Sequence, residues 1–280
     1  MTVPMATNLE EIISQVARRV DAMKRTLGPN DESRLVAERP DTPRGFTAAL
    51  SSSSGSTIVV GGIMRASPSG DLADPPADID AADMARAIEA GGAAAVSVST
   101  ERKFFGGSVE DLQAVRAETK LPVLRRDFII DPYQVPRSYG AGADAILVIV
   151  RAVPDDAVLH RIFDSAERLR LDVVSEICDE GDASRLLRIA EDSPSALRVV
   201  GLGDRDFAPG DDSPDALAKL SEMMPKATAC LCLSPIDGRG RIDEIRAAAP
   251  RISRFLVASA LAKTDDPSGF LRALRDEPRS

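Results

Sequence analysis

The segment 121–134, LPVLRRDFIIDPYQ, places charged side chains at the end of a short apolar run. If this run is a strand, Pro122, Leu124 and Arg126 share one of its faces. In a parallel barrel Arg126 would then lie at the carboxyl end of the strand, where such barrels build their active sites. A guanidinium in that position can clamp a carboxylate or a phosphate. Local charge pairing in a surface Arg-Arg-Asp turn is the alternative that the spacing leaves open.

Three further charged residues follow other apolar runs and are candidates for proton transfer. Glu176 closes the run 172–177, whereas Glu101 and Lys103 come just after the run 94–98. The two glutamates can serve as acid and base, and burial in a barrel mouth can lower the pKa of a lysine. Each also has an ordinary explanation, because Glu176 can form a structural ion pair and Lys103 can be a solvated loop residue.

Histidine and cysteine usage excludes several kinds of site. The only histidine is His160, so a multi-histidine metal site is excluded and a Ser-His-Asp triad would depend on that one residue. The three cysteines are Cys178, Cys230 and Cys232, which make neither an even disulfide set nor a zinc ligand array. We therefore expect no metal and a cytoplasmic protein.

Composition points to an acidic protein that binds a small molecule. The net charge of −9 and the scattered 35 Lys and Arg residues do not indicate a surface for nucleic acid or an anionic membrane. No apolar run approaches the ~18 residues that a membrane helix needs, and residues 1–10 lack the pattern of a signal peptide. The oligomeric state cannot be read from the sequence.

From Thr57 onward, eight short apolar runs alternate with longer amphipathic segments. The runs lie at 57–62, 94–98, 122–126, 144–150, 172–177, 197–202, 228–233 and 254–259. This alternation predicts an α/β fold, a single (β/α)8 TIM barrel. A Rossmann-type sheet would need a G-x-G-x-x-G turn after the first strand, and that strand is followed instead by IMRASPSG.

The chain ahead of the barrel divides into a helix and a link. Helical spacing is clear over 8–27, with Asn8 as the capping candidate, and 28–56 is rich in Pro, Ser and Gly. We therefore expect an N-terminal helical extension and linker over 1–56 and the barrel over 57–280. Within the barrel, Asp131 followed by Pro132 predicts the start of a helix.

Several motifs, taken together, resemble those of indole-3-glycerol phosphate synthases. They are SPSG at 67–70, TERKFFGGS at 100–108, LPVLRRDFIIDPYQ at 121–134, GADAILVI at 142–149, SEICDE at 175–180 and GLGDRDF at 201–207. They occur in the family's order and span nearly the whole chain. The resemblance implies a cofactor-free TIM barrel of tryptophan biosynthesis. Such enzymes close and decarboxylate an anthranilate-derived ribulose phosphate, then remove water to form indole.

The resemblance also shows where this chain departs from the family's catalytic pattern. The family's first strand reads E-x-K-x-x-S-P-S, with Glu and Lys facing inward, and these two positions are Gly62 and Met64 here. The family's general-acid lysine of the third strand is matched by Arg126. Arginine keeps the charge, but its pKa above ~12 makes it a poor proton donor at neutral pH. Glu176 matches the family's general base.

The later strands show the same mixture of kept and lost groups. The family's asparagine of the sixth strand falls on Gly203, while its arginine is kept as Arg205. The Glu-Ser-Gly that ends the seventh strand is matched by Leu233, Ser234 and Pro235, so one backbone N–H donor to the phosphate is lost. The Gly-Ser of the eighth strand is matched by Ala258 and Ser259. The chain thus keeps some of the family's phosphate-binding groups and has lost others.

The resemblance implies roles for twelve residues of this chain. We expect catalytic roles for Glu176 as base, Arg126 as anion clamp and Lys103 as a replacement cation. We expect substrate binding by Ser67, Ser69, Glu101, Phe105, Phe128, Leu147, Arg205, Ser234 and Ser259. The substrate would be a small molecule that is both phosphorylated and aromatic.

Three functions are compatible with these residues. The first is a divergent lyase or cyclase of the indole-3-glycerol phosphate synthase type, acting on an aryl-amine or sugar-phosphate-like substrate. The second is a non-catalytic relative that binds a ligand or partner. The third is a genuine indole-3-glycerol phosphate synthase. Loss of several acid–base groups, each commonly worth 10² to 10⁴ in rate, favours the first over the third.

Overall fold

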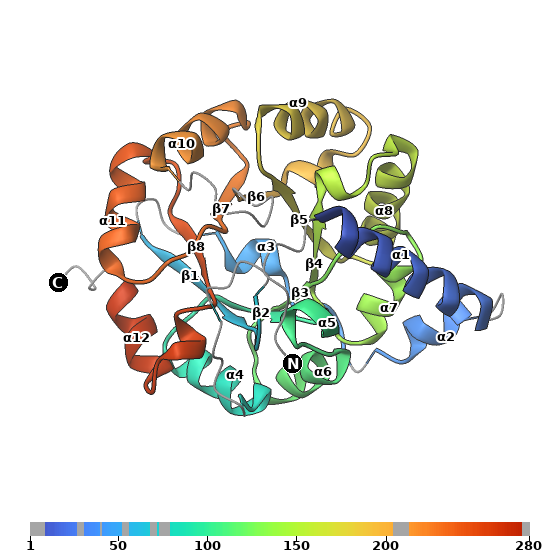
Figure 1. Ribbon diagram of the computed structural model, residues 1–280, viewed down its shortest axis with the longest axis horizontal. Coiled ribbons are helices and arrows are strands. Elements are labelled where there is room, and N and C mark those ends of the chain that lie inside the picture. Colours follow the sequence, from blue (N-terminus) through green and yellow to red (C-terminus); the bar gives the residue numbers. More distant parts are fainter. Residues whose placement is uncertain are drawn as a thin grey trace.

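The computed structural model shows a closed barrel of eight parallel strands surrounded by helices (Figure 1). It describes residues 9–26, 31–39, 41–51, 56–67, 72, 79–203 and 213–275. The strands are β1 (Ile58–Ile63), β2 (Ala95–Ser99), β3 (Val123–Arg126), β4 (Ala145–Ile149), β5 (Asp172–Ile177), β6 (Val199–Leu202), β7 (Ala229–Cys232) and β8 (Arg254–Val257). Each strand pairs with the next, and β1 pairs with β8. The predicted (β/α)8 barrel is therefore confirmed.

Helices connect the strands on the outside of the barrel, as Figure 1 shows. They are α4 (Ala81–Ala90), α5 (Arg102–Phe105), α6 (Val109–Glu118), α7 (Gln134–Gly140), α8 (Asp156–Arg168), α9 (Glu180–Ile189), α10 (Pro214–Met223), α11 (Arg239–Ala248) and α12 (Pro267–Leu274). Most of them begin at a side-chain cap; for example, Asp80 accepts hydrogen bonds from the first turn of α4 and Ser108 from that of α6. Short 3-10 turns cover Val150–Ala152, Pro194–Leu197 and Leu261–Lys263.

The predicted start of α7 is wrong by two residues. Asp131 and Pro132 form a turn, and the helix begins at Gln134. The side chain of Gln134 accepts hydrogen bonds from the backbone N–H groups of Ile130 and Asp131 and donates one to the carbonyl of Phe128. The hydrogen bonds of this buried amide therefore hold the loop after β3 in place, and the helix begins only after that loop.

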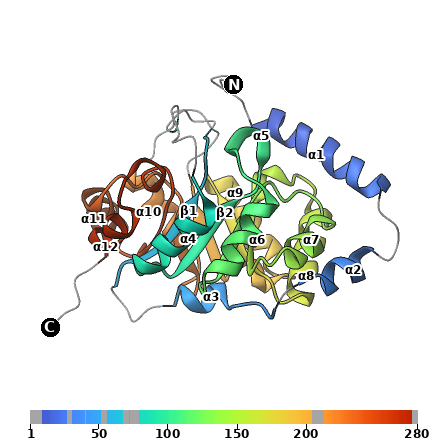
Figure 2. The same cartoon turned by 90° about the horizontal axis from the view of Figure 1, so that it is seen from below.

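The N-terminal extension covers two opposite ends of the barrel. Helix α1 (Leu9–Thr26), predicted over 8–27, lies on the same side as α5, and α3 (Phe46–Ala49) lies on the other side (Figure 2). Helix α2 (Asp31–Ala37) packs against α7. The capping candidate Asn8 and part of the 28–56 link lie outside the described residues.

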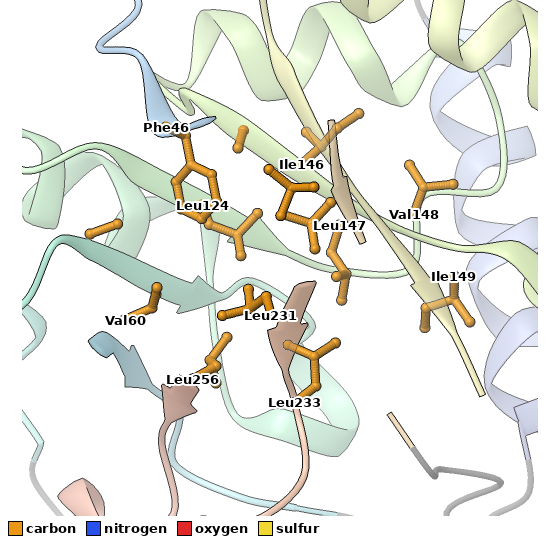
Figure 3. Close-up of a cluster of buried hydrophobic side chains, with 14 of the residues drawn as sticks. Phe46, Val60, Leu124, Ile146, Leu147, Val148, Ile149, Leu231, Leu233 and Leu256 are labelled. Atoms are coloured by element: carbon orange, nitrogen blue, oxygen red, sulfur yellow. The ribbon is translucent and has the colours of Figure 1, made fainter. Parts of the chain in front are cut away.

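The barrel interior is filled by aliphatic side chains from alternate positions of the strands. Val60, Leu124, Leu147 and Leu231 point into this space, and Phe46 of α3 approaches Leu124 (Figure 3). Phe46 is fully buried, as is Leu50 just after α3. Burial of one such side chain stabilises a fold by about 1.5–3 kcal/mol. Part of the segment interpreted as a link is therefore packed into the core.

A buried charge cluster fixes the extension to the amino-terminal end of β4. The carboxylate of Asp144 accepts hydrogen bonds from Arg39 (2.9 Å), from the backbone N–H of Val123 (2.8 Å) and from Arg116. The backbone N–H of Arg44 donates to the same carboxylate (2.7 Å). The Asp144 and Arg39 side chains are 0% and 2% exposed, so the pairing takes place away from water.

Within the described ranges, no helix combines the length and the apolar character that crossing a bilayer requires.

Candidate functional site

The strand register brings the predicted catalytic pair to one end of the barrel. Arg126 is paired in register with Ser99 of β2, and Glu176 is paired with Ile149 of β4. All four are the last or nearly the last residues of their strands. Because the carboxyl ends of parallel strands meet at one rim, their side chains surround the same space.

A cleft at this rim contains both members of the pair. It is lined by Ser99, Glu101, Phe105, Arg126, Asp127, Phe128, Leu147, Ile149 and Glu176. Glu176 is 7% exposed and lies on the inward face of β5, whereas the neighbouring Ser175 points outward and donates to the carbonyl of Ala196. The alternation that predicted an inward Arg126 is borne out by its place in the lining.

Aromatic and aliphatic side chains form part of the wall of the cleft. The rings of Phe105 and Phe128 lie 6.1 Å apart at an angle of 44°. The guanidinium carbon of Arg126 lies 5.7 Å from the centre of the Phe105 ring, within reach of a cation–π interaction. A flat aryl group that carries a carboxylate would find an apolar wall and a cation side by side.

Arg125 and Arg126 point in opposite directions and perform different tasks. Arg125 donates to Thr100 (2.9 Å), Ser138 (3.0 Å) and Asp127 (2.7 Å) behind the rim. The turn is therefore charge-paired, as the alternative interpretation held, but through Arg125, which leaves Arg126 in the cleft. Burial raises the pKa of Asp127, but Arg125, Arg19 and Thr100 outweigh it, so this pKa lies below its usual range.

Helix α1 is fastened to the cleft by an arginine that the sequence analysis did not single out. Arg19 lies 3.5 Å from a carboxylate oxygen of Glu101 and 3.5 Å from one of Asp127. Both carboxylates line the cleft. Lys24 pairs with Asp131, and the buried face of the helix packs on the barrel through Ile12, Val16 and Val20.

Replacing Arg19 by glutamine is expected to loosen α1 without unfolding the barrel. An ion pair of this exposure contributes up to about 1 kcal/mol, so amide exchange over residues 9–26 should accelerate about fivefold. Mass-spectrometric hydrogen exchange measures this directly. Arg18→Gln is the matched control, because Arg18 is exposed and donates a hydrogen bond to Ser14 of the same helix. Equal hydrogen-exchange protection of residues 9–26 in both variants would contradict the proposed role of Arg19 in holding α1 against the barrel.

A second half of the cleft lies on the other side of Arg126, and its lining is mixed in polarity. This half is lined by Met64, Arg126, Leu233, Ser234, Pro235, Ile236, Leu256, Ala258 and Ser259. The Arg126 Nη1 atom lies 3.8 Å from the sulfur of Met64. Among the described residues, three carboxylates line the first half, here called the charged half, and none lines the second half; Arg126 lines both.

The structure brings together most of the twelve residues expected at the site. Glu101, Phe105, Arg126, Phe128, Leu147 and Glu176 line the charged half. Ser234 and Ser259 line the second half together with Arg126. Ser67 is buried just after β1 but lines neither half. Ser69 and Arg205 lie outside the described residues.

Lys103 is not brought into the cleft. Its ammonium group donates to Gln15 of α1 (2.9 Å) and lies 5.0 Å from the centre of the Phe104 ring, on the exposed side of α5. The helix α5 turns this side chain outward while it buries Phe104 and Phe105. Helical periodicity over residues 102–105 would have predicted that Lys103 points away from the buried Phe104 and Phe105. In the described part of the chain, no three His, Cys, Asp or Glu residues are grouped as a metal site would require.

Comparison with known proteins assigns the family. The indole-3-glycerol phosphate synthase profile matches residues 9–274, which includes α1 and all eight strands. The chain belongs to this family. A relative named indole-3-glycerol phosphate synthase from Nocardioides sp. is 36% identical and covers 95% of this chain and 97% of its own. A second, from Koribacter versatilis, is 33% identical and covers 96% and 99%.

Solved structures agree with the barrel fold at low sequence identity. A 3-hexulose-6-phosphate synthase superposes with a TM-score of 0.58 at 18% identity, over 78% of this chain and 97% of that one. The N-(5'-phosphoribosyl)anthranilate isomerase from Pyrococcus furiosus gives 0.54 at 11% identity, over 78% and 96%. These likenesses show the fold alone, whereas the family rests on the sequence relatives.

Proposed function

We propose that this member of the indole-3-glycerol phosphate synthase family is a carbon–carbon lyase with an altered set of proton-handling groups. Its substrate would be an aryl-amine carboxylate that carries a sugar-derived, phosphorylated chain. The observation that supports this most is that Arg126 and Glu176 line one cleft with aromatic walls. The cytoplasmic location expected from the odd number of cysteines belongs to the same proposal.

Most of the expected site residues have a chemical task in this proposal. Arg126 holds the substrate carboxylate against the aryl wall of Phe105 and Phe128, and it does not act as the acid. Glu176, at the end of β5, removes a proton as base. Ser67, Ser69, Arg205 and Ser259 are proposed to hold the phosphate, with Ser234 beside them. Lys103, which donates to Gln15, has no catalytic task in this proposal.

The ordinary synthase reaction is the second candidate, and the relatives favour it. Those compared here carry the name indole-3-glycerol phosphate synthase at 33% to 36% identity over almost the full chain. Against it, Met64 and Leu233 line the cleft where the family resemblance places a lysine and a glutamate. Two apolar side chains cannot replace a proton donor and an acceptor.

Parallel assays separate the two candidates. The purified chain and the Nocardioides relative would be given the anthranilate-derived ribulose phosphate, and indole formation would be followed by fluorescence. We expect turnover at least 10²-fold below that of the relative, because more than one acid–base group has been lost. Comparable turnover would establish the ordinary synthase and contradict the altered chemistry.

Binding should survive where turnover does not. The reduced, unreactive form of the same compound is expected to bind the wild-type protein, and Arg126→Gln should weaken it by about 10- to 100-fold, as loss of a hydrogen bond to a charged group predicts. Isothermal titration measures both. Arg102→Gln, on the exposed side of α5, is the control and should bind as wild type. Absence of binding by the wild type would contradict the proposed function itself.

A further inference from the structure

The charged half of the cleft has few side chains that can hold an anion. Of the described residues that line it, only Arg126 and Ser99 carry side-chain hydrogen-bond donors when the three carboxylates are ionised. The remaining lining residues are apolar. A carboxylate that enters this half therefore depends on these two side chains for its direct side-chain hydrogen bonds.

Arg126 and Ser99 lie side by side at the rim. They are register partners on the neighbouring strands β3 and β2, and both line the cleft. The guanidinium of Arg126 reaches as far as Met64, just after β1, with 3.8 Å between Nη1 and the sulfur. Because β2 lies between β1 and β3, this guanidinium crosses the end of β2, where Ser99 is. One ligand group can therefore contact both residues.

The hydroxyl of Ser99 is not used by the fold in the described part of the chain. Ser99 is 4% exposed, and its hydroxyl makes no hydrogen bond to a described residue. The next residue differs, because the Thr100 hydroxyl donates to Asp127 (2.7 Å) and accepts from Arg125 (2.9 Å). Buried hydroxyls normally have a partner, so the Ser99 hydroxyl is available for a partner that a ligand supplies.

Thr100 and Arg125 show how such a pair binds a carboxylate. Both donate to the same oxygen of Asp127, each over 2.7 Å, behind the rim. An arginine of β3 and a hydroxyl at the end of β2 thus share one carboxylate. Arg126 and Ser99 repeat these two residue types on the opposite, inward faces of the same strands.

We infer that Ser99 binds the ring carboxylate of the substrate together with Arg126, and that it thereby selects aryl-amines that carry this group. This inference rests on the proposed function and adds a specificity-determining residue to the same site. Arg126 compensates the charge of the carboxylate, while the Ser99 hydroxyl donates to one of its oxygens and fixes its position beside the aryl wall. Hydrogen bonds to an ionised acceptor are stronger than those between neutral groups.

Two matched ligands test the inference by isothermal titration. The reduced form of the anthranilate-derived ribulose phosphate and the same compound without its ring carboxylate share the ring, the amine and the phosphorylated chain. Ser99→Ala is expected to weaken binding of the first by about tenfold, as loss of a hydrogen bond to a charged group predicts, and of the second by less than about twofold. Ser99→Cys keeps the size of the side chain but has only a weak S–H donor, so its loss should match that of Ser99→Ala.

Ser97→Ala is the matched control. Ser97 lies two residues earlier on the same face of β2, is 1% exposed and is not part of the cleft lining, so this variant should bind both ligands as wild type. The inference would be overturned by wild-type binding of the carboxylate ligand to Ser99→Ala or Ser99→Cys, by an equal loss for both ligands, or by an equal loss in Ser97→Ala. Each of these results would leave the proposed function standing, whereas failure of the wild type to bind the carboxylate ligand would contradict the proposed function itself.

Discussion

Restoring the family's charged residues at positions 62, 64 and 126 is expected to give indole formation only when Ala258 is changed to glycine at the same time. The triple variant Gly62→Glu, Met64→Lys, Arg126→Lys has no room for its new glutamate. A Cβ atom at residue 62 would lie 2.6 Å from the Cβ of Ala258 and 3.2 Å from the carbonyl oxygen of Val257. The first of these contacts is removed by Ala258→Gly.

The expected gain in activity is large because proton donors are being returned. Each positioned acid or base commonly contributes 10² to 10⁴ in rate, so the quadruple variant should form indole at least 10²-fold faster than the wild-type chain. The triple variant should remain near the wild-type rate or express poorly. Fluorescence detection of the indole product, with the anthranilate-derived ribulose phosphate as substrate, measures all three proteins.

A stability cycle tests the steric cause separately from the chemistry. Gly62→Ala alone should lower the free energy of unfolding by about 1–3 kcal/mol through overpacking, and Gly62→Ala with Ala258→Gly should recover most of that loss. Gly61→Ala is the matched control, since its Cβ would meet Ile88 at 2.5 Å on the other face of β1. Rescue of Gly61→Ala by Ala258→Gly, or no rescue of Gly62→Ala, would contradict the pairing of residues 62 and 258.

This pairing illustrates what the sequence alone did not disclose. The changes at Gly62 and Ala258 were each visible against the family pattern, but nothing along the chain connects them. They face each other because the barrel closes between β1 and β8, where Val60 pairs with Leu256 and Gly61 with Val257. The loss of the family's glutamate side chain at residue 62 and the gain of a methyl group at residue 258 are therefore sterically coupled.

The barrel itself was predictable because its signal is local and repeated. Each of the eight apolar runs became a strand whose bounds lie within two residues of those predicted. Alternation also placed Arg126 on the same face of β3 as Leu124, whereas the family resemblance placed Glu176 in the site. The start of α7 was missed because the Gln134 side chain bonds the preceding loop, and propensity at Asp131 carries no information about that contact.

The part of the site built by α1 depends on contacts across the fold. Arg19 reaches Glu101 and Asp127, which lie more than eighty residues further along the chain, and no spacing rule connects them. The exposed position of Lys103 was likewise set by the direction of a single short turn. Motif comparison therefore found Arg126, Leu147 and Glu176 among the strand residues that line the cleft, but it missed Ser99, Ile149 and the arginine that comes from the extension.

Replacing Asp144 by alanine is expected to be the most destabilising single change considered, with a loss of about 3–5 kcal/mol in the free energy of unfolding. Removing one member of a buried ion pair leaves the other charge without compensation. Here two guanidinium groups, those of Arg39 and Arg116, are 2% and 3% exposed and would both lose this partner. The backbone N–H of Val123 would lose its acceptor as well.

The same substitution should leave the cleft chemistry nearly unchanged, because Asp144 lies at the amino-terminal end of β4, opposite the rim that carries Arg126. Chemical denaturation followed by circular dichroism gives the stability, and titration with the reduced ribulose phosphate analogue gives the binding. Asp83→Ala is the control, since its carboxylate is 70% exposed and pairs with Arg86 in solvent, where such pairs contribute about 0–1 kcal/mol. If Asp144→Ala cost no more than Asp83→Ala, the cluster would be dispensable, and attachment of the N-terminal extension would depend on Phe46 and Leu50 instead.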